Sequence, residues 1–209
     1  MKCCNVFELV GDRSTEVRSL SDWVPLLILC LLIDPKDGIS DLVTKAERFK
    51  RPQRGGIEKD LAIAMSILEQ ARSMLLHSGI TDPCLNLKVY FRLMTVALDL
   101  AHDGEWTIDC RLNQHRLAEE YGVRAMTAAR MTGNASKMAQ VRLEQTFWKG
   151  REAELEDKRV TDPWEIRRVK DEALKEMRIA MEELKVSDRD KFERYKPRVS
   201  NWQKRLSGP

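Results

Sequence analysis

The side chains of this sequence that could transfer protons or hold a metal are three histidines and several pairs of carboxylates. His77, His102 and His115 have no HxxxH or HExxH spacing and no paired cysteines, so we expect no metal site. Pairs such as Glu119-Glu120 and Glu182-Glu183 could act as general acid and base. Lysine or arginine lies three or four residues from these pairs, which is typical of solvated ion pairs on a helix face. We therefore expect no catalytic residue, no cofactor and no enzymatic activity.

Basic side chains gather in two stretches that could meet phosphate or carboxylate groups. Residues 45–56 carry five basic residues and one acid, and they end in Gly-Gly. From residue 194 onward there are five basic residues and no acid, with Tyr195 and Trp202 among them. Each stretch has two interpretations: a nucleic-acid or acidic-protein contact, or a purely structural one. The candidate contacts are Lys50, Arg51, Arg54, Arg194, Lys196, Arg198, Lys204 and Arg205.

The structural interpretations of these stretches are the ones we favour. Residues 45–56 have the composition of a basic linker, for which a nuclear-import signal is the alternative. The tail is expected to form a capping helix. In that helix the basic groups stay in solvent, and the following residues pack on the preceding hairpin: Phe192, Tyr195, Val199, Trp202 and Leu206.

The composition predicts long helices that position these side chains. The chain has 209 residues, of which 36 are basic, 33 are acidic and 43% are apolar, with only 10 glycines and 7 prolines. This length supports one domain or slightly more, with a real core. The composition excludes collagen-like and disulfide-stapled folds. A net charge of +3 is too small to imply a nucleic-acid partner by itself.

The cysteines and the apolar run near the N-terminus indicate the cellular compartment of the protein. Five cysteines without CxxC spacing argue against a disulfide framework, so we expect a reducing compartment, the cytoplasm or the nucleus. Cys3 and Cys4 could be acylated, although two unmodified thiols are the simpler interpretation. The run 23–33 spans 11 residues, whereas a membrane helix needs about 20. We expect a buried helix in an N-terminal segment 1–44, and no membrane span.

Apolar residues recur at helical spacing from residue 57 to the end. Asp-Pro pairs at 82–83 and 162–163 are helix-start signals, and Thr132-Gly133-Asn134 resembles a C-cap. The expected helices begin near 57, 83, 109, 135, 163 and 188, and the helix from 83 is apolar on two faces. A turn is expected at 34–38. We predict an all-α fold of antiparallel hairpins, with a repeat core at 57–160 and a charged C-terminal hairpin or cap at 161–209.

Three segments of the central region follow one another in a recognisable order: 101–106 (AHDGEW), 117–125 (LAEEYGVRA) and 129–134 (ARMTGN). They resemble the turns and helices of tetratricopeptide (TPR) helical repeats. A hairpin of about 52 residues exceeds the standard ~34, which leaves the repeat subtype open. The resemblance implies a short TPR-like solenoid, a scaffold or adaptor that binds another protein on its concave face. The polar positions we assign to that face are Arg92, Asp99, Gln114, Arg124, Arg142 and Gln145.

A second resemblance covers part of the same region. Gly104-Glu105-Trp106 and residues 117–127 are similar to the GntR-type winged helix-turn-helix. It implies a DNA-binding regulator that uses residues 109–131, with Arg124, Thr127 and Arg130 facing the groove. The sequence departs from that family where Arg124 replaces the serine that usually caps the recognition helix. The two resemblances imply different structures after Gly133: a long helix for the repeat, or a two-stranded wing for the regulator.

Overall fold

The computed structural model of the chain describes residues 34–49, 57–103, 107–157 and 162–207. Within these ranges the fold is all-α, as the sequence predicts, and no strand occurs in them. The described helices are α3 (Pro35–Phe49), α4 (Ile57–His77), α5 (Pro83–Asp103), α6 (Ile108–Thr132), α7 (Ala135–Asp157), α8 (Pro163–Ser187) and α9 (Arg189–Leu206).

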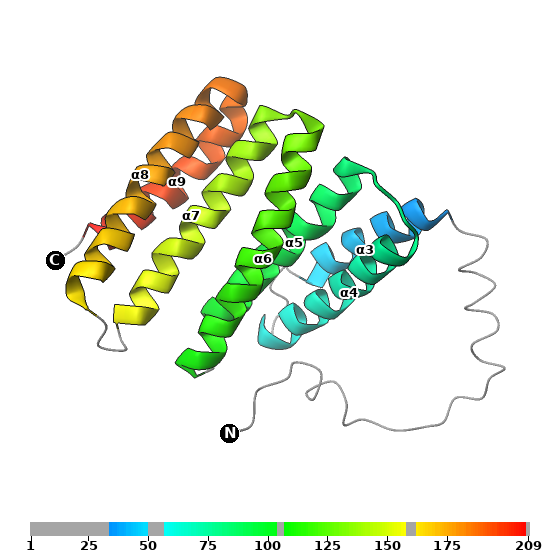
Figure 1. Cartoon of the computed structure of the whole chain (residues 1–209), viewed down its shortest axis with the longest axis horizontal. Helices are drawn as coiled ribbons and strands as arrows, with labels where there is room; N and C mark the ends of the chain where they lie inside the picture. The colour runs from blue at the N-terminus through cyan, green and yellow to red at the C-terminus, as the bar shows by residue number, and fades with distance from the viewer. Residues whose placement is uncertain (1–33, 50–56, 104–106, 158–161, 208–209) are drawn as a thin grey trace.

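Consecutive helices run antiparallel and stand side by side in a row, from α3 and α4 at one end to α8 and α9 at the other (Figure 1). The largest contacts are those of α5 with α6 and of α7 with α8. The odd-numbered helices also touch one another in order, α3 on α5, α5 on α7 and α7 on α9. These contacts form a stack of helical hairpins, in which α3, α5, α7 and α9 make one continuous layer.

The helix-start and helix-end signals act as predicted. Asp82 accepts a hydrogen bond from the Cys84 amide at 2.8 Å, and Asp162 accepts one from the Trp164 amide at 3.0 Å. Each caps a helix whose first residue is proline, where the missing N–H costs nothing. Gly133 has a φ of 64° and closes α6 in the left-handed conformation that glycine adopts without strain. The helices therefore begin within a residue of the expected positions.

Helix α3 corrects two sequence expectations. The turn expected at 34–38 is the start of α3, and the basic linker expected over 45–56 is wrong for its first five residues, which complete this helix. Asp34 caps α3 by accepting from the Lys36 amide at 2.9 Å, and Pro35 fits the first turn. Burial of Ile39, Val43 and Ala46 holds the helix on its neighbours. The run 23–33 and residues 50–56 lie outside the described residues.

The core consists of two apolar clusters that share α7. The first joins α3, α4, α5 and α6 to Val141 and Trp148 of α7, and the second joins Leu143 and Phe147 of α7 to α8 and α9. Both predicted stripes of α5 are buried in the first cluster, for example at Leu93 and Met94. Because α7 is buried on both sides, it ties the two ends of the row together. None of the described helices is long and apolar enough to cross a membrane.

Residues 109–131 lie in one unbroken helix, α6. No turn divides it near Gly122, where a helix-turn-helix would need one, and the residues after Gly133 form α7 rather than strands. In α6 the small residue Gly122 permits close packing of α5 and α7. A Cβ atom on Gly122 would lie 3.0 Å from the Gln145 amide nitrogen and 3.1 Å from the Met94 sulfur.

Candidate functional site

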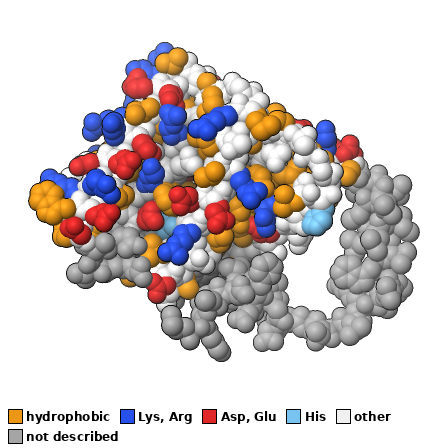
Figure 2. Space-filling view, viewed as in Figure 1, with side chains coloured by type: hydrophobic (Ala, Val, Ile, Leu, Met, Phe, Trp, Pro, Cys, Tyr) orange, Lys and Arg blue, Asp and Glu red, His pale blue; other side chains and the backbone are white. Residues whose placement is uncertain are grey.

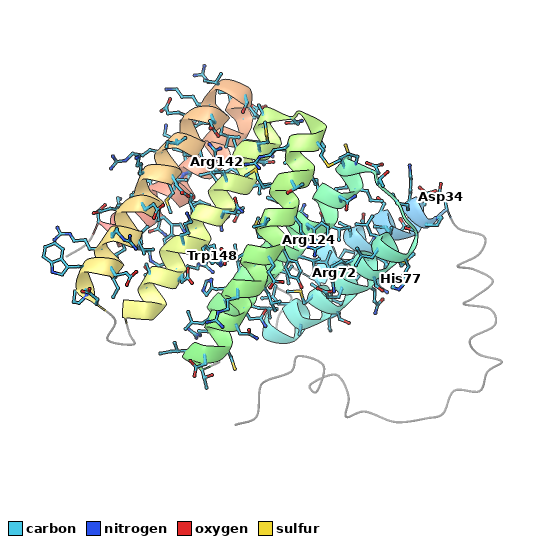
Figure 3. All side chains as sticks on the ribbon, viewed as in Figure 1. Asp34, Arg72, His77, Arg124, Arg142 and Trp148 are labelled. Atoms are coloured by element: carbon cyan, nitrogen blue, oxygen red, sulfur yellow. The ribbon has the colours of Figure 1, made fainter. Side chains whose placement is uncertain are left out.

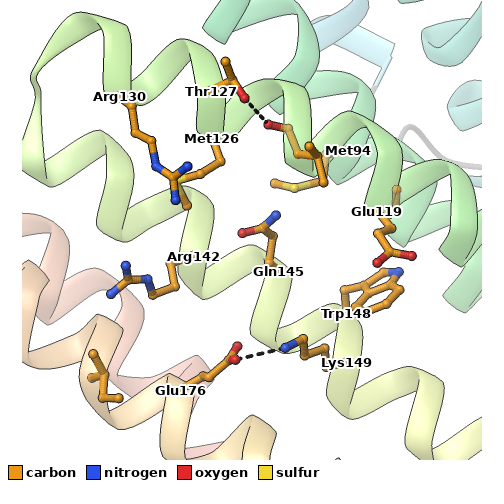
Figure 4. A pocket seen from close by; sticks show the side chains of 13 residues that line it. Met94, Glu119, Met126, Thr127, Arg130, Arg142, Gln145, Trp148, Lys149 and Glu176 are labelled. Carbon is orange, nitrogen blue, oxygen red and sulfur yellow. Dashed lines mark hydrogen bonds and ion pairs between the residues drawn. The ribbon is translucent and has the colours of Figure 1, made fainter.

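Helices α6, α7 and α8 enclose a groove of about 540 Å³, which we call the α6–α8 groove (Figure 4). Of the six polar residues assigned to a binding face, Arg142 and Gln145 line this groove together. The absence of a side chain at Gly122 lets Gln145 of α7 approach α6 closely beside the groove. The residues that line it are Met94, Ala118, Glu119, Val123, Met126, Thr127, Arg130, Arg142, Gln145, Trp148, Lys149, Glu176 and Ile179.

Trp148 in the floor of the α6–α8 groove is anchored by contacts with α6. Trp148 is buried, and its indole N–H donates to the backbone carbonyl of His115. The rings of His115 and Trp148 also pack in a T-shaped arrangement, with centroids 6.4 Å apart. Both polar and apolar ends of the indole are therefore fixed by α6, as buried tryptophans require. Beside Trp148, the Lys149 amino group pairs with Glu176 of α8 at 2.9 Å.

Apolar side chains stay exposed along this groove. Val123 of α6 is 56% exposed and Ile179 of α8 is 44% exposed, and Met126 is half-buried between the groove and the core. Around them lie both signs of charge, including Arg142, which pairs with Glu183 of α8. Figure 2 shows the same mixture of basic and acidic side chains across the face seen in Figure 1. An apolar centre with a charged rim is the usual anatomy of a protein-binding surface.

The other assigned residues lie elsewhere. Gln114 is only 4% exposed and lines a groove between α4 and α6, where the Tyr121 hydroxyl donates to Glu69. Burial raises the pKa of Tyr121, and the bond to Glu69 adds to the shift. Arg124 donates to the Tyr90 hydroxyl at 3.3 Å and thereby links α6 to α5 (Figure 3). The six residues therefore do not share one surface.

Arg92 and Asp99 lie on α5, away from the α6–α8 groove. Arg92 pairs with Glu47 of α3 at 2.6 Å and lines a groove on the layer of odd-numbered helices. Asp99 is half-buried and lines none of these three grooves.

The C-terminal basic residues divide into two kinds. Val199, Trp202 and Leu206 are buried against α7 and α8, so α9 packs as a capping helix. Two of its arginines form ion pairs with α7 while their side chains remain 41% exposed, as expected for basic groups that stay in solvent. Arg198 pairs with the buried Glu144 at 2.7 Å, and Arg205 donates two hydrogen bonds of 2.6 and 3.1 Å to the Glu154 carboxylate.

The remaining basic candidates keep their charge at the surface or lie outside the described residues. Arg194 and Lys204 are exposed, and Lys196 pairs loosely with Glu193 at 3.7 Å. Lys50, Arg51 and Arg54 lie outside the described residues.

Sequence reasoning missed the exposed apolar side chains of the groove. Val123 and Ile179 fall between the buried stripes of their helices, and that position is the signal that could have identified them. In the described part of the chain, no group of three or more His, Cys, Asp or Glu side chains is placed to hold a metal. Comparison of the chain with models of protein families, with curated proteins and with solved structures gives no match.

Proposed function

We propose that the chain is a non-enzymatic protein-interaction module, a short TPR-like array that binds a segment of a partner protein in the α6–α8 groove. The observation that carries this proposal is the exposure of Val123 and Ile179, beside the half-buried Met126, along a groove whose floor includes the anchored indole of Trp148. An anchored floor lowers the entropy cost of binding, and burial of these apolar side chains supplies the driving force.

The ion pairs of the groove suit a segment that is apolar in its centre. Arg142–Glu183 and Lys149–Glu176 join α7 to α8 along the groove. Because each pair compensates its own charge, the two pairs do not select one sign of charge in a docked segment. The long α7 after Gly133 fits this interpretation better than it fits a winged DNA-binding domain. The cysteine content supports the cytoplasm or the nucleus as the place of action.

The test is a pair of charge insertions read out by affinity capture and quantitative mass spectrometry. We expect partners retained by the wild type to be lost from the V123D/I179D double variant, because each carboxylate would be buried without a counter-charge in the complex. For a purified partner the loss should be about tenfold or more in affinity.

The matched control is V186D, because Val186 is 88% exposed on α8 and does not line the α6–α8 groove. Both variants should keep the helical circular dichroism and the melting temperature of the wild type. Retention of the same partners by V123D/I179D would remove the α6–α8 groove as the binding site.

A further inference from the structure

The groove that Arg92 lines has a volume of about 620 Å³ and lies on the layer formed by α3, α5, α7 and α9. We call it the basic groove. The half-buried Phe91 of α5 is its most open apolar side chain, and the buried Val43, Leu87 and Val141 lie beneath it. Three basic side chains and one acidic side chain line it: Lys88, Arg92, Lys137 and Glu47.

The carboxylates around the basic groove are already engaged. Glu47 pairs with Arg92 at 2.6 Å, and Glu144 with Arg198 at 2.7 Å. Asp188 pairs with Lys191 at 2.8 Å. At the start of α5, Asp82 accepts from the backbone amides of its own helix.

Two lysine ammonium groups of the basic groove are not paired with any of these carboxylates. Within the described residues, Lys88 and Lys137 have no ion pair. They are both exposed, so a ligand can reach them.

The positive charges converge on Lys137. Loss of water around its amino group lowers the pKa of Lys137, and the charges of Lys191, Arg92 and Lys88 lower it further, against the opposing effect of Asp188. Like charges held this close repel one another, and an anion placed among them would relieve that repulsion.

The backbone adds to the positive potential of the basic groove. Lys137 lies in the first turn of α7 and Lys88 in the second turn of α5, and neither helix has an acidic side chain in its first turn. Helices α3, α6, α8 and α9 each have one there. Because the N-terminal end of a helix carries a partial positive charge, Lys137 adds to the positive potential at the start of α7, whereas Asp82 at the N-cap of α5 offsets part of it near Lys88.

We propose that the basic groove binds an acidic segment of a partner protein, with carboxylates on Lys88 and Lys137 and an apolar side chain on Phe91 and Leu87. Phe91 lines the same groove as the two lysines and suits a peptide side chain, and Glu47 in that lining disfavours the continuous row of phosphates in a nucleic acid. The basic groove and the α6–α8 groove share no lining residue, so the two proposals can be tested independently.

The test is fluorescence anisotropy of the full chain with a labelled peptide of about ten residues, glutamates around a central leucine. We expect saturable binding that weakens as salt is raised. The K88Q/K137Q double variant should bind at least about tenfold more weakly, whereas V123D/I179D should bind like the wild type. The matched control is K175Q/K204Q, which removes the same charge from two exposed lysines outside the basic groove.

Three outcomes would overturn the proposal. The first is an absence of binding by the wild type at low salt. The second is equal affinity of the wild type and K88Q/K137Q, which are both expected to melt at the same temperature because only surface lysines change. The third is tighter binding of a single-stranded oligonucleotide of the same net charge than of the peptide, which would assign the groove to nucleic acid.

Discussion

The buried Glu144 of α7 joins this helix to α9 through its side-chain contacts. Its side chain is only 5% exposed, and it accepts from the Tyr195 hydroxyl at 3.1 Å and from Arg198 at 2.7 Å. Burial raises the pKa of Tyr195, and the Glu144 carboxylate adds to the shift, so the hydroxyl remains a donor. The Arg198 guanidinium also lies 4.2 Å from the centre of the Phe147 ring. These bonds all join α9 to α7, so the buried charge aligns helices.

The ion pair of Asp188 predicts that the stability of the folded protein depends on pH. It caps α9 and its carboxylate accepts from Ser136 and pairs with Lys191, which lowers its pKa to about 2 from 3.8. The ionised form is thus favoured in the folded protein. Its stabilising effect is present above the unfolded pKa and is lost as the pH falls through about 2.

The substitution D188N tests this linkage, because asparagine keeps the helix cap and removes the charge. We expect the difference in unfolding free energy between wild type and D188N to be largest above about pH 5 and to shrink as the pH falls toward about 2. D190N, which removes a carboxylate from the same first turn, is the charge control. A difference that stays constant with pH would contradict the assigned ion pair.

The sequence pattern predicts the helix on which each residue lies, but not whether its side chain is buried. The helical period places Arg142 and Gln145 on α7 and Gln114 on α6, but it does not say which neighbouring helix covers each face. Helices α6 and α7 are buried on more than one side, so their polar residues do not form a separate stripe. For this reason Gln114 could be taken for a surface residue although it is buried.

At the scale of elements, short local signals were enough to find most helices. Asp-Pro at 82–83 and 162–163 and Gly133 each act through hydrogen bonds within a few residues, and such signals are readable without the tertiary structure. Asp34-Pro35 is the same signal, yet the nearby Gly38 made it look like a turn. Its helix depends on the burial of Ile39 and Val43 by other helices, which no local signal records.

Gly150 gives a prediction about how α9 docks on α7. A Cβ atom at Gly150 would lie 3.1 Å from a Leu206 methyl carbon and 3.4 Å from the Trp202 ring. In G150L the larger side chain should push α9 away, at a cost of about 1–3 kcal/mol in unfolding free energy. The measurement is chemical denaturation together with hydrogen exchange of residues 189–206, which should lose protection.

The matched control is G150A. The gain in helix propensity, about 1 kcal/mol, should offset the small shift that Leu206 must make. G150A should therefore stay within about 1 kcal/mol of the wild type. Equal stability of G150L and G150A would mean that α9 does not pack on Gly150.

The whole molecule behaves as a row in which each helix touches mainly its neighbours along the chain. α3 contacts α4 and α5, and α9 contacts α8 and α7, whereas the inner helices are enclosed from both directions. The α6–α8 groove and the basic groove therefore both use α7, the helix that belongs to both apolar clusters. A partner bound in either groove rests on the part of the row that is supported from both ends.

This architecture predicts a gradient of local stability. Stacked helices contribute through their own stability and through contacts with neighbours, so opening should start at the ends of the row. In native-state hydrogen exchange under increasing urea, α5, α6 and α7 should be the most protected and α9 the least. W202A removes the indole that packs on Phe147, with ring centroids 6.1 Å apart, and should raise exchange in α9 while leaving α5 and α6 unchanged. If every helix instead opens at one common free energy, in the wild type and in W202A alike, the row is a single cooperative unit and α7 transmits the loss of α9 through both clusters.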